Sequence, residues 1–588
     1  MKPVKNALKC LDEIQMINKS MLSVFTCTMK MQLLYSLAVL MCASHSLEAQ
    51  VTERSRPEEW KQLVPGGRFM DRFLPMPAGS LGSDVWGAPV VIPRYVDNGI
   101  EDAERSYWGG NILKGEDGKY HMFVCGWPES SPKGHFEWPN STVYHATADN
   151  SIGPFTVINT IGQGHNPEAF RLADGRYVVY VIGAYYISDS LNGPWSRTQF
   201  TFDPRGRNII EGLSNLTFAK RGDNSFLMVC RGGGVWISQT GISPYRQISD
   251  KRIYPAVAGE FEDPVVWRDH VQYHVIVNDW LGRIAYYLRS PDGIHWVTDP
   301  GEAYMPGVAR HEDGKKEDWF KYERIKIFQD EHGRAIQANF AVIDVLKDHD
   351  KAHDKHSSKN ISIPLNPGVL LQILNTEKIT DTTPEVRVLI QAEKGFDPLK
   401  DVDVASLRFG PSSEVNFGRG WKVLRSEASG KDLLLTFQTE GTGLPEEEFA
   451  PKLLGRSSAG NMLFGYARLP WVNYNPAILS PVKPSFSLRD GKMEFHAEIE
   501  NFGQVPSQGA DFELVLMDGD KSPTLARTSI SGVMVPYASK ELTLTMDYSF
   551  EPGKQYRFKL LIKGRDGWKS SFEFTETPQK AEKSLNLR

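Results

Sequence analysis

Carboxylates, a histidine and an arginine recur at matching places in the first half of this 588-residue chain. Aligning segments on their aromatic residues superposes five triplets: Gly109-Gly110-Asn111, Asn166-Pro167-Glu168, Asn215-Leu216-Thr217, Asp263-Pro264-Val265 and Arg324-Ile325-Lys326. Strand residues two apart share a face, so the first and third members of each triplet point the same way. Apart from Gly109 and Val265 that set is polar, and we expect it to line one channel.

Two carboxylates that meet in a channel can perform acid–base chemistry. Burial and neighbouring charges move their pKa values apart, so that one group is protonated while the other is ionised. Cleavage of a glycosidic bond needs such a pair, an acid at the leaving oxygen and a carboxylate that acts on water or on the anomeric carbon. The candidate catalytic residues are Glu168, Asp263, Glu262 and Glu323, with Glu211 as a further carboxylate upstream of the third triplet.

Residues one position before each triplet should lie at the rim of the channel. With the channel residues they give the candidate substrate-binding set: Trp108, Asn111, His165, Asn166, Asn215 and Arg324. Trp86, Trp127 and Trp138 offer further faces for stacking, and the guanidinium of Arg324 suits a substrate carboxylate or sulfate. Structural roles compete with all of these: Asp263 can cap a turn, the glutamates can pair with Arg324 or Lys326, and tryptophans often pack in cores.

A recurring sequence motif indicates which elements position these residues. A tight turn precedes an aromatic strand at Tyr120, Tyr177, Phe226 and Tyr273, and a fifth turn lies at residues 331–334. The repeats close on Gly153-Pro154-Phe155, Gly193-Pro194-Trp195, Ser243-Pro244-Tyr245 and Gly293-Ile294-His295-Trp296. A spacing of roughly 50 residues is typical of four-stranded propeller blades. The sequence therefore predicts an all-β protein with a five-bladed β-propeller.

The remaining chain predicts two further β domains. We expect the propeller to span residues 50–346, with residues 50–105 supplying a strand that closes the last blade, and a charged linker over 347–360. Alternating strands such as 386–390 and 433–437 predict a β-sandwich over 361–478. Strands such as 493–499 and 556–562 predict a C-terminal immunoglobulin-like β-sandwich over 479–588.

The N-terminal residues 1–49 have the pattern of a signal peptide with an upstream segment. An apolar run from Leu33 to Cys42 follows Lys30, and Ala49 offers a cleavage site. Leu40-Met41-Cys42 is a poor lipobox, so a secreted or periplasmic protein is favoured over a lipoprotein. We find no other apolar run near the roughly 18 residues of a transmembrane helix.

The net charge indicates which class of partner is disfavoured, and the cysteine positions indicate whether a disulfide is expected. A net charge of −5 disfavours a nucleic-acid partner, which calls for a basic face. Cys125 and Cys230 lie at matching places in the first and third repeats, a whole blade apart, so we expect two unpaired, buried thiols. The oligomeric state is left open.

His165-Asn166-Pro167-Glu168, Phe261-Glu262-Asp263-Pro264 and the Gly-Pro-Trp closures resemble the five-bladed β-propeller glycoside hydrolases, a superfamily that includes families 43, 32, 117 and 130. The resemblance covers roughly residues 85–346. It implies a hydrolase that removes terminal sugars from poly- or oligosaccharides without a cofactor, although members can carry a calcium ion in the channel. Asn166, Asp263 and His165 are then its candidate contacts; the sequence has no dedicated metal cage.

The chain departs from the catalytic pattern of family 43, which takes an Asp from the first blade, an Asp from the second and a Glu from the third. Its first inner strand carries no carboxylate, and its second carries Glu168. Asp84 or Asp102 are candidate replacements for the missing base. Two alternatives stay open: a noncatalytic glycan-binding propeller, and a polysaccharide lyase with His165 as base and Arg324 as uronate neutraliser.

Overall fold

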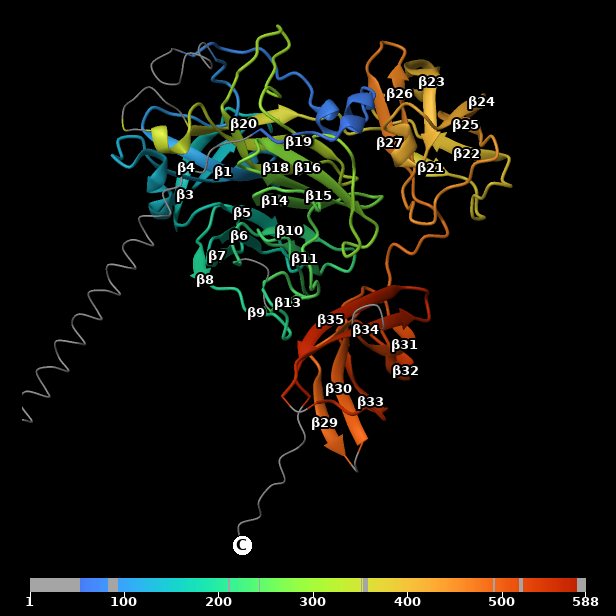
Figure 1. Cartoon of the computed structure of the whole chain (residues 1–588). Helices are drawn as coiled ribbons and strands as arrows, with labels where there is room; N and C mark the ends of the chain where they lie inside the picture. The colour runs from blue at the N-terminus through green and yellow to red at the C-terminus, as the bar shows by residue number, and fades with distance from the viewer. Residues whose placement is uncertain are drawn as a thin grey trace, which may run out of the picture. The chain divides into compact units, whose positions relative to one another are not determined.

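The computed structural model describes residues 53–82, 94–209, 212–242, 244–350, 352, 358–489, 492–517, 522–551 and 553–578. Strands dominate the described elements (Figure 1), which confirms the all-β prediction. The expected signal peptide, Asp84, Trp86 and Glu211 lie outside the described residues, so the structure does not test them.

The described residues between 105 and 364 form five sheets. The first holds β1 (Arg105–Lys114), β2 (Tyr120–Pro128), β3 (Thr142–Ala148) and β4 (Thr156–Gln163); the second holds β5 (Glu168–Arg171), β6 (Tyr177–Val181), β7 (Ala184–Ser188) and β8 (Ser196–Thr198). The third holds β10 (Thr217–Lys220), β11 (Phe226–Val229), β12 (Val235–Ser238) and β13 (Tyr245–Gln247), with β9 (Phe202–Asp203) parallel to β13. The fourth holds β14 (Phe261–Arg268), β15 (Tyr273–Asp279), β16 (Ile284–Ser290) and β17 (Val297–Thr298); the fifth holds β18 (Lys321–Gln329), β19 (Ala335–Ile343) and β20 (Ser358–Pro364).

The predicted aromatic anchors mark one position in this repeat. Tyr120, Tyr177, Phe226 and Tyr273 each begin the second strand of a sheet, and the fifth predicted turn ends where β19 begins. The first strands of the sheets lie against one another: β1 contacts β5 and β18, and β14 contacts β10 and β18. Side-chain bonds from Glu168 to Thr217 and to the Phe218 amide join β5 to β10. The first strands, which carry the five triplets, are therefore neighbours.

The fifth sheet extends beyond the predicted end of the repeats at residue 346. Its third strand, β20, comes after the charged stretch and pairs with β19 over seven residues, for example Ile361 with Phe340. The predicted boundaries at 346 and 360 thus cut through a sheet, because residues 358–364 alternate in the way that suits an added strand. The segment before β1 also reaches this sheet, through single bridges from Ile100 to Asn360 and from Phe73 to Leu365.

The next region forms one seven-stranded sheet in the order β21-β22-β25-β24-β23-β26-β27 among its described residues. Its strands are β21 (Leu371–Ile373), β22 (Glu385–Ile390), β23 (Val402–Gly410), β24 (Trp421–Ser429), β25 (Asp432–Gln438), β26 (Lys452–Ser457) and β27 (Met462–Tyr466), with short helices α2 (Pro398–Asp401) and α3 (Ser412–Val415). Leu371 and Leu463, from strands at opposite ends of this sheet, belong to one buried cluster. The sheet must therefore curve over itself, where two separate sheets were expected.

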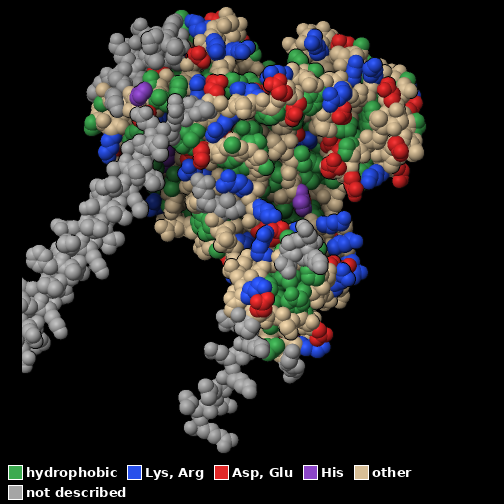
Figure 2. All heavy atoms as spheres, viewed as in Figure 1, with side chains coloured by type: hydrophobic (Ala, Val, Ile, Leu, Met, Phe, Trp, Pro, Cys, Tyr) green, Lys and Arg blue, Asp and Glu red, His purple; other side chains and the backbone are tan. Residues whose placement is uncertain are grey.

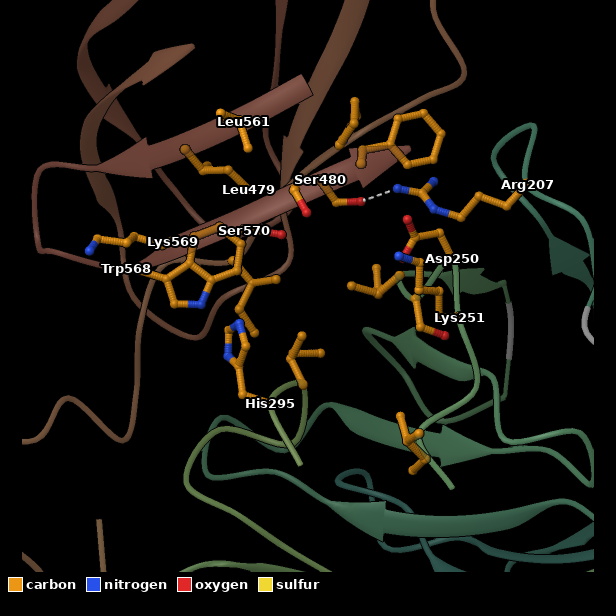
Figure 3. A pocket seen from close by; sticks show the side chains of 18 of the residues that line it. Arg207, Asp250, Lys251, His295, Leu479, Ser480, Leu561, Trp568, Lys569 and Ser570 are labelled. Carbon is orange, nitrogen blue, oxygen red and sulfur yellow. Dashed lines mark hydrogen bonds between the residues drawn. The ribbon is translucent and has the colours of Figure 1, made fainter. Parts of the chain in front are cut away.

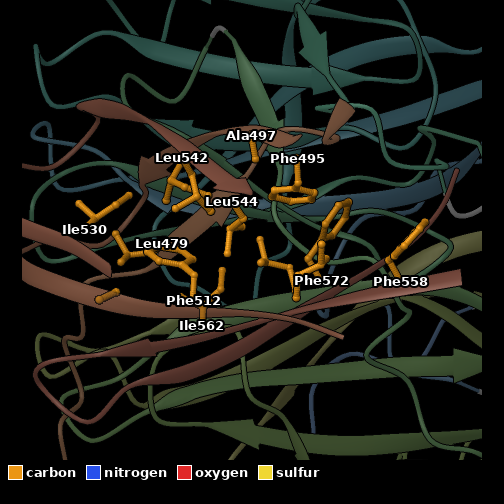
Figure 4. Packing of buried hydrophobic residues seen from close by; sticks show 14 of the residues in the cluster. Leu479, Phe495, Ala497, Phe512, Ile530, Leu542, Leu544, Phe558, Ile562 and Phe572 are labelled. Atoms are coloured by element: carbon orange, nitrogen blue, oxygen red, sulfur yellow. The ribbon is translucent and has the colours of Figure 1, made fainter. Parts of the chain in front are cut away.

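The C-terminal region has two sheets among its described residues. One holds β28 (Leu479–Pro481), β29 (Ser485–Arg489), β30 (Lys492–Asn501) and β33 (Ser539–Met546); the other holds β31 (Ser507–Leu516), β32 (Thr524–Met534), β34 (Tyr556–Gly564) and β35 (Lys569–Glu576). Figure 4 shows Phe495 and Leu544 of the first sheet packed with Phe512 and Phe558 of the second. A common apolar core joins the two sheets, because alternate residues of each strand face it.

Other features of the described chain concern its surface and its thiols. Lysine and arginine side chains are interspersed with aspartate and glutamate on the face shown in Figure 2. No helix in the ranges given above is long and apolar enough to cross a bilayer. Cys125 and Cys230 are buried and are not joined to each other by a disulfide, as predicted. Four short 3-10 helices complete the description: η1 (Glu58–Gln62), η2 (Phe69–Arg72), η4 (Gly134–Asn140) and η5 (Lys347–His349).

Replacement of Gly99 by alanine tests the contact between the N-terminal segment and β20. Gly99 has φ +66°, and an added Cβ would collide with the carbonyl oxygen of Asn360. Gly118→Ala is the matched control, because Gly118 has φ +82° with nothing within 4 Å of the added atom. The control should lose about 1–2 kcal/mol from its backbone conformation alone, and Gly99→Ala should have the lower melting temperature of the two. Equal melting temperatures would contradict the contact.

Candidate functional site

The first residue of each superposed triplet has a left-handed backbone. The φ values are +50° at Gly109, +55° at Asn166, +49° at Asn215, +54° at Asp263 and +51° at Arg324. Glycine, asparagine and aspartate tolerate this conformation, whereas arginine rarely adopts it. Breaks in strand pairing accompany it in β1, β14 and β18. The same kink is thus built five times, and it aims the side chains of neighbouring strands at one another.

An ion pair between Asp263 and Arg324 lies at the centre of these kinks. Arg324 Nη1 is 2.9 Å from Asp263 Oδ1, and the Arg324 amide donates to Asp263 Oδ2 at 3.2 Å. Asn215 donates to the same carboxylate at 2.9 Å, and Arg324 Nη2 donates to the Asn166 carbonyl at 3.3 Å. A Cβ on Gly109 would lie 3.3 Å from the Arg324 side chain. Asp263 and Arg324 are therefore surrounded by the left-handed residues Gly109, Asn166 and Asn215.

Glu168 forms a second buried ion pair, with Lys326. The other oxygen of the Glu168 carboxylate accepts from Thr217 Oγ1 at 3.1 Å and from the Phe218 amide at 2.8 Å. Burial lowers the pKa of Lys326 to about 8. The Glu168 side chain is 8% exposed.

These two pairs change the reading of four sequence candidates. Glu168 and Asp263 each bind a charged partner on another sheet, so they help to hold the sheets together, a role that the expectation of catalysis did not include. Arg324 is 1% exposed and holds Asp263, so it is not free for a substrate anion. Asn111 exchanges two bonds of 2.7 Å with the backbone of Ala169 and likewise joins two sheets. Local alternation found the right face of each strand but could not show how the side chains pair.

The same bonds bear on the calcium ion implied by the resemblance. Calcium takes six to eight oxygen ligands. Asp263 has both oxygens engaged by Arg324, and Asn215 donates to it as well. His165 Nδ1 lies 3.0 Å from Ser141 Oγ. These donors do not fit a calcium cage, and the Arg324 guanidinium already supplies the central cation.

Glu262 lies one residue before the central carboxylate and is more accessible. Its Oε1 accepts from Asn215 Nδ2 at 3.1 Å and lies 3.5 Å from Arg231 Nε, and its side chain is 20% exposed. Burial and the neighbouring charge of Asp263 raise the pKa of Glu262 to about 7. A large fraction of this carboxyl is therefore protonated at neutral pH.

Glu323 occupies the corresponding position before Arg324, and its protonation state is the opposite. Lys347 Nζ is 2.5 Å from Glu323 Oε2, and Lys321 Nζ is 3.6 Å from Oε1. Burial alone would favour the neutral acid, but the two ammonium groups outweigh it and hold the pKa of Glu323 below its usual value. Glu323 is therefore ionised.

Lys347 lies beside two of the candidate residues, although its local sequence did not single it out. It was assigned to a solvated linker, yet its ammonium binds Glu323 and lies 5.0 Å from the centre of the Trp108 ring. The charge run that follows it gives no local sign of this role. The pairing of β20 with β19 could have suggested it, since the chain between these strands must stay beside the sheet.

Aromatic side chains surround the ring of His165. Its ring centre lies 4.8 Å from that of Trp138, a side chain that is 37% exposed. Trp108 and Trp127 are buried against the ring of His135. Burial and the charges of Arg324 and Lys347 lower the pKa of His165 well below its usual value, so its imidazole is neutral. Trp138 is the described tryptophan of this group that offers a face to a ligand.

Asp102, the described candidate for the missing base, is held locally. It accepts from the amides of Glu104 and Arg105 at 2.9 Å and binds the Tyr107 hydroxyl. It therefore caps the turn before β1. Glu262 and Glu323 are the other two candidate carboxylates, and the charge of Glu323 contributes to the raised pKa of Glu262.

Among the comparisons with known proteins, only the comparison with solved structures found matches. No known family profile and no curated protein matches the chain. Similar solved structures include a glycoside hydrolase at 10% identity, covering 80% of this chain and 96% of that one with a TM-score of 0.33. Another is an α-L-arabinofuranosidase from Lactobacillus brevis at 12% identity, covering 47% of this chain and 92% of that one with a TM-score of 0.31. A third is a family 43 glycoside hydrolase from Bacillus licheniformis at 10% identity, covering 82% of this chain and 90% of that one with a TM-score of 0.31. At such identities residue roles do not transfer.

The pH dependence of stability tests the protonation state of Glu262 without any substrate. A pKa raised from about 4.5 to about 7 means that the folded protein favours the protonated acid, so this stabilisation is lost as pH rises through that interval. Glutamine is neutral at every pH. The melting temperature of Glu262→Gln relative to wild type should therefore increase between pH 5 and pH 8. A difference that does not change with pH contradicts the raised pKa.

Glu168→Gln should destabilise the protein, because it leaves Lys326 buried without its counter-ion. Removal of one partner of a buried pair costs about 3–5 kcal/mol. The control is Glu116→Gln, which breaks an exposed pair with Arg171 and should cost less than about 1 kcal/mol. Denaturant unfolding measures both. Wild-type stability together with lost activity in Glu168→Gln would return this residue to the catalytic candidates.

Proposed function

We propose that the chain is a carbohydrate-acting hydrolase in which Glu262 is the general acid and Glu323 is the carboxylate that acts on water or on the anomeric carbon. The five sheets are then the blades of a closed five-bladed β-propeller, and both glutamates belong to one mouth of its channel. The observation that carries the proposal is the opposite shift of the two pKa values, upward for Glu262 and downward for Glu323.

The chemistry follows from this division. Glycosidic bond cleavage needs a proton for the leaving oxygen, which Glu262 supplies from a carboxyl with a pKa near neutrality. It also needs an ionised carboxylate, which the two lysines maintain at Glu323. The exposed face of Trp138 supplies a surface on which a sugar ring can stack.

The proposal includes the biological setting predicted by the sequence. The substrate is a terminal sugar of a poly- or oligosaccharide. The protein acts on it outside the cytoplasm, after the predicted signal peptide has been removed. The two C-terminal regions are accessory β-sandwich domains. The sugar and its linkage depend on loops around the mouth, which vary independently of the fold.

A noncatalytic glycan-binding protein is the second candidate, and one observation favours it. The Glu323 side chain is 2% exposed and both of its oxygens lie near lysines, an arrangement that also suits a purely structural carboxylate. The lyase alternative is weaker, because Arg324, its proposed uronate neutraliser, is occupied by Asp263.

Substitution of the two glutamates separates these candidates. Glu262→Gln and Glu323→Gln should each lower the rate of sugar release from a panel of oligosaccharides by about a hundredfold or more. The wild-type rate should be bell-shaped in pH, falling above about 7 as Glu262 ionises and falling at low pH as Glu323 is protonated. Full activity in either variant removes that residue from the mechanism. Binding of oligosaccharides without new reducing ends supports the noncatalytic candidate.

A further inference from the structure

A cavity of about 640 Å³ lies between loops of the third and fourth sheets and the C-terminal region, and its walls include neither Glu262 nor Glu323. Residues 248–253 and 294–296 form one wall, and residues 478–481 and 568–572 form the opposite wall. Figure 3 shows side chains from both walls around a common space, with Arg207 reaching toward Ser480. The volume is that of a small-molecule site.

Arg207 is a buried cation with little compensation. Its residue is 8% exposed, and its guanidinium lies 4.4 Å from the centre of the Phe572 ring. Nη2 donates to Ser480 Oγ at 2.9 Å, but Nε and Nη1 have no hydrogen-bond partner within the described part of the chain. Burial and the charge of Arg205 lower the pKa of Arg207 to about 9. Buried donors without acceptors are costly, so the protein alone leaves this site incomplete.

Arg205, two residues earlier, shows what a structural arginine looks like at the same junction. Its Nη1 is 2.6 Å from Glu500 Oε2, and its Nη2 donates to the Ser480 carbonyl at 2.7 Å. Arg246 binds the other oxygen of Glu500 at 2.9 Å. The two walls are thus held together by Arg205 and Glu500, and Arg207 is not needed for that purpose.

The walls are positively charged. Their described residues include five cations, which are Arg207, Lys251, Arg252, Lys559 and Lys569, and one carboxylate, Asp250. Asp250 accepts from the Glu573 amide. Lys251 and Lys559 share the Glu573 carboxylate, at 3.1 and 3.4 Å. Positive charge therefore exceeds negative charge around the cavity, which favours an anion.

Aromatic side chains add a second recognition element. Trp296 and Trp568 line the cavity together with the cations, and the Trp568 ring lies 6.0 Å from that of His295. Ring faces beside cations suit a ligand that combines an apolar face with an oxyanion, as an acidic sugar does.

We propose that this cavity binds the sulfate or carboxylate group of an anionic saccharide, with Arg207 as its buried donor. The oxyanion part follows from the orphaned guanidinium and the surrounding lysines and is independent of any activity. The saccharide part rests on the proposed carbohydrate function. The site would hold an acidic part of a glycan away from the mouth that carries the two glutamates.

Calorimetric titration of the full chain with sodium sulfate, galactose 6-sulfate, galacturonic acid and neutral galactose, at matched ionic strength, tests the site. The three anions should bind and galactose should not. Arg207→Met should weaken anion binding about tenfold or more, since hydrogen bonds to charged groups are strong. It should keep or raise the melting temperature of the ligand-free protein, because it removes an uncompensated buried charge.

Two control variants complete the design. Arg205→Met should lower the melting temperature, because it leaves Glu500 with one partner fewer. Lys119→Met removes an exposed charge far from these walls in sequence and should change neither binding nor stability. Anion binding that is unchanged in Arg207→Met, or absent in wild type, overturns the proposal. Binding of sulfate without either acidic sugar overturns the saccharide part, whether or not the chain hydrolyses glycans.

Discussion

The Asp263–Arg324 ion pair is the constraint on which the arrangement of the five first strands depends. Arg324 adopts a left-handed backbone that an arginine rarely accepts, and Asp263 binds both its amide and its guanidinium there. Around this pair, asparagines complete the polar contacts, and Gly109 leaves room for the arginine side chain. A single buried pair thus sets the mutual position of five first strands.

The pair also explains how two neighbouring glutamates differ. Glu262 and Glu323 each precede one member of the central pair at a break in strand pairing, and the charge of Glu323 acts on Glu262. The glutamate beside Asp263 experiences a like charge, whereas the one beside Arg324 has two lysines. The charges of Asp263 and Arg324 compensate each other, whereas Glu262 lies beside a like charge and Glu323 beside two opposite ones.

Repetition made much of the fold predictable. The aromatic anchors located the second strand of four sheets, and a turn located that of the fifth, because these signals depend on local sequence that recurs. The first residue of each superposed triplet proved to be left-handed, which the sequence analysis did not predict. The pairing of side chains between different sheets was not predictable in this way. Whether Glu168 meets a substrate or Lys326 depends on residues 158 positions apart, and alternation along a strand carries no information about such a partner.

The middle region shows another limit. Its strands were correctly expected near residues 386–390 and 433–437, yet their order in one curved sheet depends on long-range pairing and on breaks in register within β23 and β24. The charged stretch that begins at Lys347 was interpreted as a linker for a related reason. High charge density usually indicates solvated chain, but the first residue of this stretch is held by a buried carboxylate.

That arrangement has a consequence for how the chain can be divided. Lys347 is fixed from both sides, by β19 before it and by β20 after it, and β20 in turn receives the segment around Ile100. Shortening the polypeptide to its first 346 residues would delete a sheet's outer strand and, in the same cut, the ammonium group that keeps Glu323 charged. A fragment that keeps the whole fifth sheet together with the Lys347–Glu323 pair must therefore extend at least to residue 364.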